Sequence, residues 1–190
     1  MNIKLEKNEI RNSVKNLRRS MSEEEKSLSD KKILNKLLGL WSFRNSEVVL
    51  CYVSNKIEVS TRDFIEEALR RNKTVAVPKC IDGTRDMDFY IISSFDDLSV
   101  GSFGIDEPDE KKCKKLESFE DSVCIVPALT FDNEGYRLGF GKGYYDRFLS
   151  GYSGTKIGIC YESCITQKLP RGKYDCKVDT LVTDRRIIIT

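Results

Sequence analysis

Two stretches with helical spacing of hydrophobic residues come first in the chain. Ile10, Val14, Leu17 and Met21 recur every three or four positions, which predicts an amphipathic helix. The segment Ser22-Glu-Glu-Glu25 is a capping box, so a second helix is expected to begin there. We expect this second helix to end near Trp41, and its core face is predicted to be Leu34, Leu37, Leu38 and Trp41.

Short hydrophobic runs then alternate with further helical segments. Continuous runs of this length are typical of strands buried on both faces of a sheet. Strands are expected at residues 48–53, 74–78, 87–92, 123–131, 156–161, 180–183 and 186–190, and helices at residues 61–71 and 144–150. The order strand, helix, strand favours right-handed parallel connections. The pattern therefore predicts an α/β fold, a three-layer αβα sandwich with a mainly parallel, Rossmann-like sheet.

The least regular region is the segment 93–122, which we interpret as a loop with a short helix. It contains a cluster of lysines between positions 111 and 115 that is expected to be a solvated surface. No repeat, linker or shift in composition divides the chain. A length of 190 residues suits one domain, so residues 1–190 are expected to form a single domain.

Composition narrows the class of protein. Charged residues make up 33% and apolar residues 39% of the chain, as in ordinary globular proteins. The longest apolar run is much shorter than a membrane span, and the amino terminus lacks the pattern of a secretory signal. Seven cysteines form no Cys-x-x-Cys pair, so reduced thiols in the core are expected. We therefore expect a cytoplasmic protein without a membrane partner.

Histidine is absent from the sequence. This excludes catalysis by Ser-His or Cys-His pairs, imidazole general bases and histidine metal ligands. Any chemistry must come from carboxylates, lysine, arginine, tyrosine, backbone amides or a metal ion held by oxygen ligands.

A glycine-rich loop is the strongest candidate for such chemistry. Gly139, Gly141 and Gly143 surround Lys142, after a predicted strand and before a predicted helix. Converging backbone N–H groups, a helix N-terminus and a lysine together favour phosphate binding. The loop is not a Walker A motif, because the residue five positions before Gly141 is Tyr136, and its glycine spacing does not fit a dinucleotide fingerprint. From spacing alone, a plain tight turn stays possible.

The surrounding residues resemble a known family. Pro127-Ala-Leu-Thr-Phe-Asp132 and Gly135-Tyr-Arg-Leu-Gly-Phe-Gly-Lys-Gly-Tyr-Tyr-Asp-Arg-Phe-Leu149 are similar to the signature of the 5-formyltetrahydrofolate cyclo-ligases. The resemblance extends over nearly the whole chain. Its other matches are Lys7-x-x-x-Arg11, Arg18-Arg19-Ser-Met-Ser22, Glu58, Pro78-Lys79, Gly104-Ile-Asp-Glu-Pro108 and Lys177-Val-Asp-Thr180.

This resemblance implies an ATP- and Mg²⁺-dependent enzyme. In the implied reaction ATP phosphorylates the formyl oxygen of 5-formyltetrahydrofolate. The side-arm nitrogen then closes on the formyl carbon, and ADP and phosphate are released with 5,10-methenyltetrahydrofolate. Phosphorylation is needed because an amide oxygen is a very poor leaving group, and such transfers depend mainly on positioning and charge.

The resemblance also implies residue roles. Lys142 and Arg137 are the expected catalytic residues, and Asp146 and Asp179 the expected Mg²⁺ ligands. Nucleotide binding is expected from Lys7, Arg11, Arg137, Leu138, Gly139, Phe140, Gly141, Lys142, Gly143, Tyr144 and Tyr145. Folate binding is expected from Val53, Glu58, Phe140, Gly141, Lys142, Gly143 and Tyr144, with the Glu58 carboxylate accepting hydrogen bonds from the pterin ring.

Each role has a plainer alternative. Asp146 can be the acidic residue of a helix first turn, and Asp179 a charge at a strand edge. Lys7 and Arg11 can be solvated charges. Many relatives carry a polar or basic residue where this chain has Phe140, and where relatives often have His-Asp the chain has Tyr174-Asp175.

Two other functions compete with this interpretation. A sugar-phosphate isomerase or CoA-transferase-like enzyme would share the sandwich and bind phosphate without ATP or Mg²⁺. Nucleic-acid binding is suggested by the six Lys and Arg residues among positions 1–20, but the net charge of the whole chain is only +2. We therefore expect small-molecule substrates, no nucleic-acid partner and a monomeric protein.

Overall fold

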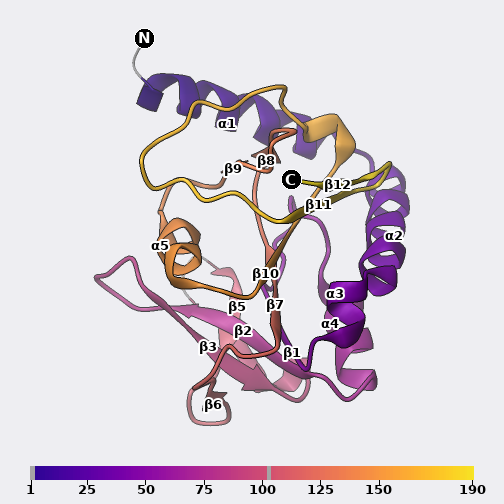
Figure 1. Cartoon of the computed structure of the whole chain (residues 1–190), viewed down its shortest axis with the longest axis vertical. Coiled ribbons are helices and arrows are strands. Elements are labelled where there is room, and N and C mark those ends of the chain that lie inside the picture. The colour runs from indigo at the N-terminus through magenta and orange to yellow at the C-terminus, as the bar shows by residue number, and fades with distance from the viewer. Residues whose placement is uncertain (1–2, 102–103) are drawn as a thin grey trace.

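A computed structural model describes residues 3–101 and 104–190. Its centre is an eight-stranded sheet with the strand order β12-β11-β10-β7-β1-β2-β3-β6 (Figure 1). The five central strands are parallel, and β12, β3 and β6 pair antiparallel at the two edges. The strands are β1 (Val48–Cys51), β2 (Thr74–Cys80), β3 (Met87–Ile92), β6 (Lys114–Lys115), β7 (Ser122–Val126), β10 (Thr155–Cys160), β11 (Thr180–Thr183) and β12 (Ile187–Ile189).

Helices cover both faces of this sheet. Figure 1 shows α2, α3 and α4 on one side and α5 on the other. α1 lies across the end of the sheet that carries the hairpin of β8 (Thr130–Phe131) and β9 (Arg137–Leu138). The expected three-layer αβα sandwich with a mainly parallel sheet is confirmed. The helices are α1 (Ile3–Ser20), α2 (Glu23–Gly39), α3 (Trp41–Asn45), α4 (Arg62–Arg70) and α5 (Tyr144–Gly151). None of the described helices is long and apolar enough to cross a membrane.

The capping box at the start of α2 forms as expected. The Ser22 side chain accepts a hydrogen bond from the Glu25 N–H at 3.1 Å, and the Glu25 side chain accepts one from the Ser22 N–H at 3.0 Å. The predicted core position of Trp41 is wrong. Leu40 has an extended backbone (φ −64°, ψ 135°), so α2 ends at Gly39 and Trp41 begins a new helix with its side chain 78% exposed.

The run 123–131 does not form one strand. β7 ends at Val126, and the chain then enters a separate two-stranded sheet of β8 (Thr130–Phe131) and β9 (Arg137–Leu138). Pro127 follows β7 directly and has no N–H with which to continue a ladder. The irregular segment 93–122 also contains more structure than expected among its described residues: η1 (Phe95–Asp97), β4 (Leu98–Val100), β5 (Asp106–Pro108) and β6.

The strand order places a crevice at one end of the sheet. β1 lies between β2 and β7, and the chain leaves β1 through α4 toward β2 but leaves β7 toward β10 on the other side. These two connections cover opposite faces of the sheet (Figure 1). Where connections diverge in this way, the carboxyl ends of the two strands leave room for a ligand. A ligand site is therefore expected beside the residues that follow Cys51 and Val126.

The core consists mainly of the central strands and the helix faces packed on them. Its cysteines behave as small hydrophobic side chains: Cys51, Cys124 and Cys160 are fully buried. All seven cysteines of the chain are free thiols.

Candidate active site

A cavity of about 650 Å³ opens at the carboxyl ends of β1 and β7. Tyr52 and Val53 after β1 and Pro127 after β7 form part of its wall, and the whole segment 137–146 lines it. Its volume is within the range of pockets that enclose a small ligand. The cavity therefore lies at the point where the strand connections diverge, as the topology requires.

The glycine-rich loop forms one wall through backbone conformations that favour glycine. Gly141 has φ +98° and Gly143 has φ +83°, and Gly143 is the N-cap of α5. A Cβ atom at position 141 would lie 3.2 Å from Cζ of Arg11, so the missing side chain lets α1 approach the loop. Arg11 uses this approach to donate a hydrogen bond from Nε to the Gly139 carbonyl oxygen at 2.9 Å.

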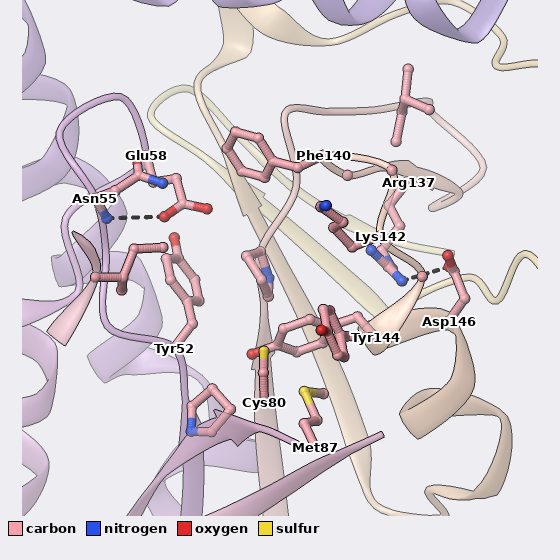
Figure 2. A pocket seen from close by; sticks show the side chains of 18 of the residues that line it. Tyr52, Asn55, Glu58, Cys80, Met87, Arg137, Phe140, Lys142, Tyr144 and Asp146 are labelled. Atoms are coloured by element: carbon pink, nitrogen blue, oxygen red, sulfur yellow. Dashed lines mark hydrogen bonds and ion pairs between the residues drawn. The ribbon is translucent and has the colours of Figure 1, made fainter. Parts of the chain in front are cut away.

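Basic side chains gather at this wall. Lys7 and Arg11 lie one turn apart on α1, and both line the cavity together with Lys142 and Arg137. Figure 2 shows Lys142 pointing into the cavity between Phe140 and Arg137. Arg137 is only 8% exposed, and its guanidinium lies over the Tyr145 ring at 5.6 Å from the ring centroid. Such an array can hold the oxygen atoms of a phosphate chain.

Two carboxylates lie within this basic array. Arg137 Nη2 contacts Asp146 Oδ1 at 2.5 Å, and Lys7 Nζ contacts Asp175 Oδ2 at 2.6 Å. Burial raises the pKa of Asp146, and the nearby Asp175 raises it further, while the charge of Arg137 acts in the opposite direction. Two neighbouring carboxylates that repel each other favour a cation between them.

Asp179 lies outside the cavity. Its Oδ2 accepts a hydrogen bond from the Lys156 N–H at 2.7 Å, beside the first residues of β10 and β11. It is not among the residues that line the cavity. The structure thus brings Asp175, rather than Asp179, next to Asp146. Among the described residues, no group of three or more histidine, cysteine or acidic side chains is arranged to hold a metal.

The opposite side of the cavity carries a buried glutamate. Glu58 is 6% exposed and accepts a hydrogen bond at Oε2 from the Asn55 N–H at 3.0 Å, as Figure 2 shows. Burial raises the pKa of the Glu58 carboxyl, and the Asn55 hydrogen bond and the charges of Arg18 and Lys26 oppose this shift. A buried carboxylate at a cavity wall can bind a ligand that carries several N–H donors.

Apolar side chains connect the two sides. Pro78, Cys80 and Met87 come from the β2–β3 hairpin, and Ile105 and Tyr144 complete this wall. Phe140 is 41% exposed, and Lys15 Nζ lies 5.5 Å from its ring centroid. The cavity therefore combines a basic end, an acidic end and an apolar wall between them.

Most of the residues selected from the sequence meet in this cavity. Its lining includes Lys7, Arg11, Val53, Glu58 and the segment 137–146, whereas Asp179 lies apart. The sequence interpretation missed Tyr52, Cys80, Met87 and Asp175. Tyr52 falls near the end of the predicted strand 48–53 and Met87 at the start of the predicted strand 87–92, positions that could have suggested them. Cys80 lies two residues beyond the predicted strand 74–78, and Asp175 lies in an irregular segment, so neither had such a signal.

Comparisons with known proteins show the family of the chain. The family model of the 5-formyltetrahydrofolate cyclo-ligase family matches residues 3–184. The chain is 33% identical to a probable 5-formyltetrahydrofolate cyclo-ligase of Schizosaccharomyces pombe, over 82% of this chain and 84% of the relative. It is 30% identical to a probable 5-formyltetrahydrofolate cyclo-ligase of Caenorhabditis elegans, over 98% of this chain and 97% of the relative.

Two solved structures are also similar to this chain over nearly its full length. The Aquifex aeolicus 5,10-methenyltetrahydrofolate synthetase superimposes with a TM-score of 0.83 at 38% identity, covering 96% of this chain and 92% of the other. The Mycoplasma pneumoniae 5,10-methenyltetrahydrofolate synthetase gives a TM-score of 0.76 at 27% identity, covering 94% and 98%. Sequence and fold therefore agree over nearly the full length, and the chain belongs to the 5-formyltetrahydrofolate cyclo-ligase family.

Proposed function

We propose that this protein converts 5-formyltetrahydrofolate to 5,10-methenyltetrahydrofolate with consumption of ATP. The observation that carries the proposal is the cavity itself, in which a buried carboxylate and a basic glycine-rich loop face each other across an apolar wall. A folate has a pterin with N–H donors, a flat aromatic body and a reacting formyl group, so it fits between the two ends. ATP supplies the phosphates for the basic end.

The reaction needs a leaving group at the formyl carbon. The formyl oxygen attacks the terminal phosphorus of ATP, the bond to the ADP oxygen breaks, and ADP leaves. The N10 nitrogen of the folate then attacks the activated formyl carbon, phosphate departs with the former formyl oxygen, and N10 loses its proton. This sequence needs positioning and charge stabilisation rather than a protein nucleophile, which agrees with a chain without histidine.

The basic residues have separate roles in this proposal. Lys142 offsets the charge that develops on the transferred phosphoryl group, and Arg137 orients that group from the cavity floor. Lys7 and Arg11 bind the remaining phosphates from α1, and the backbone of residues 138–145 encloses them. All four side chains already line one cavity, which supports a common role.

The folate occupies the other end. Glu58 accepts hydrogen bonds from the amino and ring N–H groups of the pterin, and Val53 packs beside it. The wall of residues 140–144 faces both substrates, so it brings the formyl oxygen to the terminal phosphate. This arrangement explains how one loop contributes to nucleotide and folate binding.

The carboxylates fit one Mg²⁺ ion. Asp146 and Asp175 line the cavity together, and the pKa of Asp146 is raised partly by the proximity of Asp175. Mg²⁺ takes only one or two protein carboxylates and completes its coordination with phosphate oxygens and water. Bound there, it would neutralise phosphate charge. The resemblance predicts Asp179 as the second ligand, but the geometry supports Asp175.

We also propose that the enzyme acts as a monomer in the cytoplasm without a nucleic-acid or membrane partner. Every side chain invoked above comes from one chain, so the proposed reaction requires no second copy. Light scattering coupled to gel filtration tests the monomer. A complex with RNA that weakens steeply with added salt would contradict the proposed lack of nucleic-acid binding.

An absorbance assay tests the activity. Purified protein with 5-formyltetrahydrofolate, ATP and Mg²⁺ is expected to produce the near-ultraviolet absorbance of the methenyl product, with one ADP formed per product molecule. Omitting ATP or adding a chelator for Mg²⁺ is expected to stop the reaction. A folded sample that forms no product would contradict the proposal. An isomerase or CoA-transferase-like enzyme would consume no ATP.

A further inference from the structure

A buried arginine joins the two loops that flank the folate end of the cavity. Arg18 on α1 is 4% exposed, and its Nη1 donates a hydrogen bond to the Ile57 carbonyl oxygen at 3.0 Å. Its Nη2 donates to the carbonyl oxygens of Ala128 at 2.8 Å and Leu129 at 2.6 Å. Ile57 precedes Glu58 in the loop after β1, and Ala128 lies in the loop after β7. Arg18 therefore connects the loops across the point where the strand connections diverge.

The backbone around Glu58 depends on side chains from other elements. The Tyr161 hydroxyl lies 3.2 Å from the Glu58 carbonyl oxygen and 2.8 Å from Asp30 Oδ1, and the Ser60 N–H donates to the same Asp30 oxygen at 3.2 Å. Arg18 also lies over the Tyr161 ring, 5.4 Å from its centroid. These contacts hold the backbone on both sides of Glu58, and the Asn55 N–H holds its carboxylate at 3.0 Å.

Arg18 also contributes charge at the Glu58 carboxylate. Burial raises the pKa of this carboxyl, whereas the positive charges of Arg18 on α1 and Lys26 on α2 lower it. The phenols of Tyr52 and Tyr145 face the same group and stay neutral, because burial raises the pKa of both. Arg18 is thus one of two cations that favour the ionised form needed to accept hydrogen bonds from a pterin.

We propose that Arg18 is a positioning residue for the folate substrate. Its guanidinium ties the Glu58 loop to the loop after β7, and its positive charge lies near the Glu58 carboxylate. Arg18 is not among the residues that line the cavity, so it acts through Glu58 rather than by touching the substrate. This inference rests on the proposed role of Glu58 in binding the pterin.

The test compares four variants with the wild-type enzyme: Arg18→Met, Arg18→Lys, Glu58→Gln and the double variant Arg18→Met/Glu58→Gln. Arg19→Met is the matched control, since Arg19 is the exposed neighbour of Arg18 on the same helix. KM for folate, KM for ATP and the pH profile of kcat/KM for folate are measured for each, after thermal melting has shown that each variant is folded.

Arg18→Met is expected to raise KM for folate roughly tenfold or more and leave KM for ATP unchanged, because hydrogen bonds from a charged donor are lost at the folate end only. The acidic limb of the folate profile is expected to move to higher pH. Arg18→Lys keeps the positive charge, so the acidic limb is expected to stay in place. It loses the guanidinium group that donates to three carbonyl oxygens, so KM for folate is still expected to rise. Arg19→Met is expected to behave as the wild type.

The double variant decides whether Arg18 acts through Glu58. Adding Arg18→Met to Glu58→Gln is expected to change KM for folate little, because the partner is already gone. Fully additive effects, or equal changes in the two KM values, would overturn the inference. If Arg18→Met does not fold, Arg18→Lys must still raise KM for folate alone. A wild-type KM for folate in Glu58→Gln would instead refute the proposed role of Glu58, which is a separate failure.

Discussion

Arg11 lies directly against the backbone of Gly141, and a Cβ atom at position 141 would be 3.2 Å from its Cζ atom. Gly141 also has φ +98°, a conformation that side-chain-bearing residues rarely adopt. The contact fixes how close α1 comes to the glycine-rich loop. The two structural elements that hold the proposed phosphate site therefore pack closely against each other at Gly141, beside the hydrogen bond from Arg11 to Gly139.

Gly141→Ala is expected to weaken ATP binding by pushing Arg11 away from the loop. KM for ATP should rise roughly tenfold, together with a loss of stability of about 1 kcal/mol from the strained backbone. Gly83→Ala is the matched control, because Gly83 also has a positive φ of +74° but has no atom within 4 Å of the added Cβ. It should lose similar stability while KM for ATP stays unchanged. Equal KM values in the two variants would contradict the role of the Arg11 contact.

Lys142→Met is expected to lower kcat by a factor on the order of 10² to 10³, as the loss of one charge-stabilising donor does in other enzymes. The fold should be unaffected, since Lys142 is exposed at the cavity wall. Lys111→Met, an exposed lysine outside the cavity, is the control and should keep the wild-type kcat. A rate close to wild type in Lys142→Met would exclude a catalytic role for this residue.

Three aspartate variants distinguish the possible Mg²⁺ sites. Asp146→Asn and Asp175→Asn are each expected to raise the Mg²⁺ concentration for half-maximal activity by roughly 10- to 100-fold, because each removes a carboxylate from the basic end of the cavity. Asp179→Asn should leave the Mg²⁺ requirement unchanged, since this carboxylate binds the backbone of Lys156. The opposite ranking of Asp175 and Asp179 would favour the ligand pair that the family resemblance implies.

Glu58→Gln is expected to stabilise the protein at neutral pH while impairing folate binding. Burial raises the pKa of Glu58 in the folded state above its ordinary value of 4.5, so the folded state binds more protons than the unfolded chain between these two values. The free energy of unfolding therefore falls as pH rises through this window, and an uncharged glutamine avoids that loss.

Thermal melting across a pH series measures this effect. The Tm of Glu58→Gln should exceed that of the wild type at neutral pH, and the difference should vanish below pH 4.5, where Glu58 is protonated in both states. Glu117→Gln, at an exposed position, should show no such pH-dependent difference. A Glu58→Gln variant that is less stable than the wild type at neutral pH would refute the proposed cost of burying this charge.

The fold was largely predictable from hydrophobic patterns. The buried strands and the α2 capping box are local features, and the structure contains them. Trp41 shows the limit of periodicity, because a helical pattern cannot reveal that the backbone becomes extended at Leu40. The run 123–131 shows another limit, since a continuous apolar stretch does not tell where a strand leaves its sheet.

The site was predictable where its residues are consecutive and less so where folding brings them together. The segment 137–146 stood out because its glycines and lysine are adjacent in the sequence. Asp175 could not be identified in this way, because its place beside Asp146 depends on an irregular segment and on the ion pair with Lys7. Arg18 was noticed only as part of a family match, since its burial and its three carbonyl partners are properties of the tertiary structure.

The Lys7–Asp175 ion pair joins residues 168 positions apart. During synthesis, β1, β2 and β7 are made before Asp175, and the basic end of the cavity lacks this carboxylate until then. The buried core is also incomplete at that stage, because Val178, Leu181 and Val182 follow Asp175 in the chain. The last 16 residues of the chain, 175–190, therefore complete the sheet that supports the cavity, and a chain that ends before them lacks part of both.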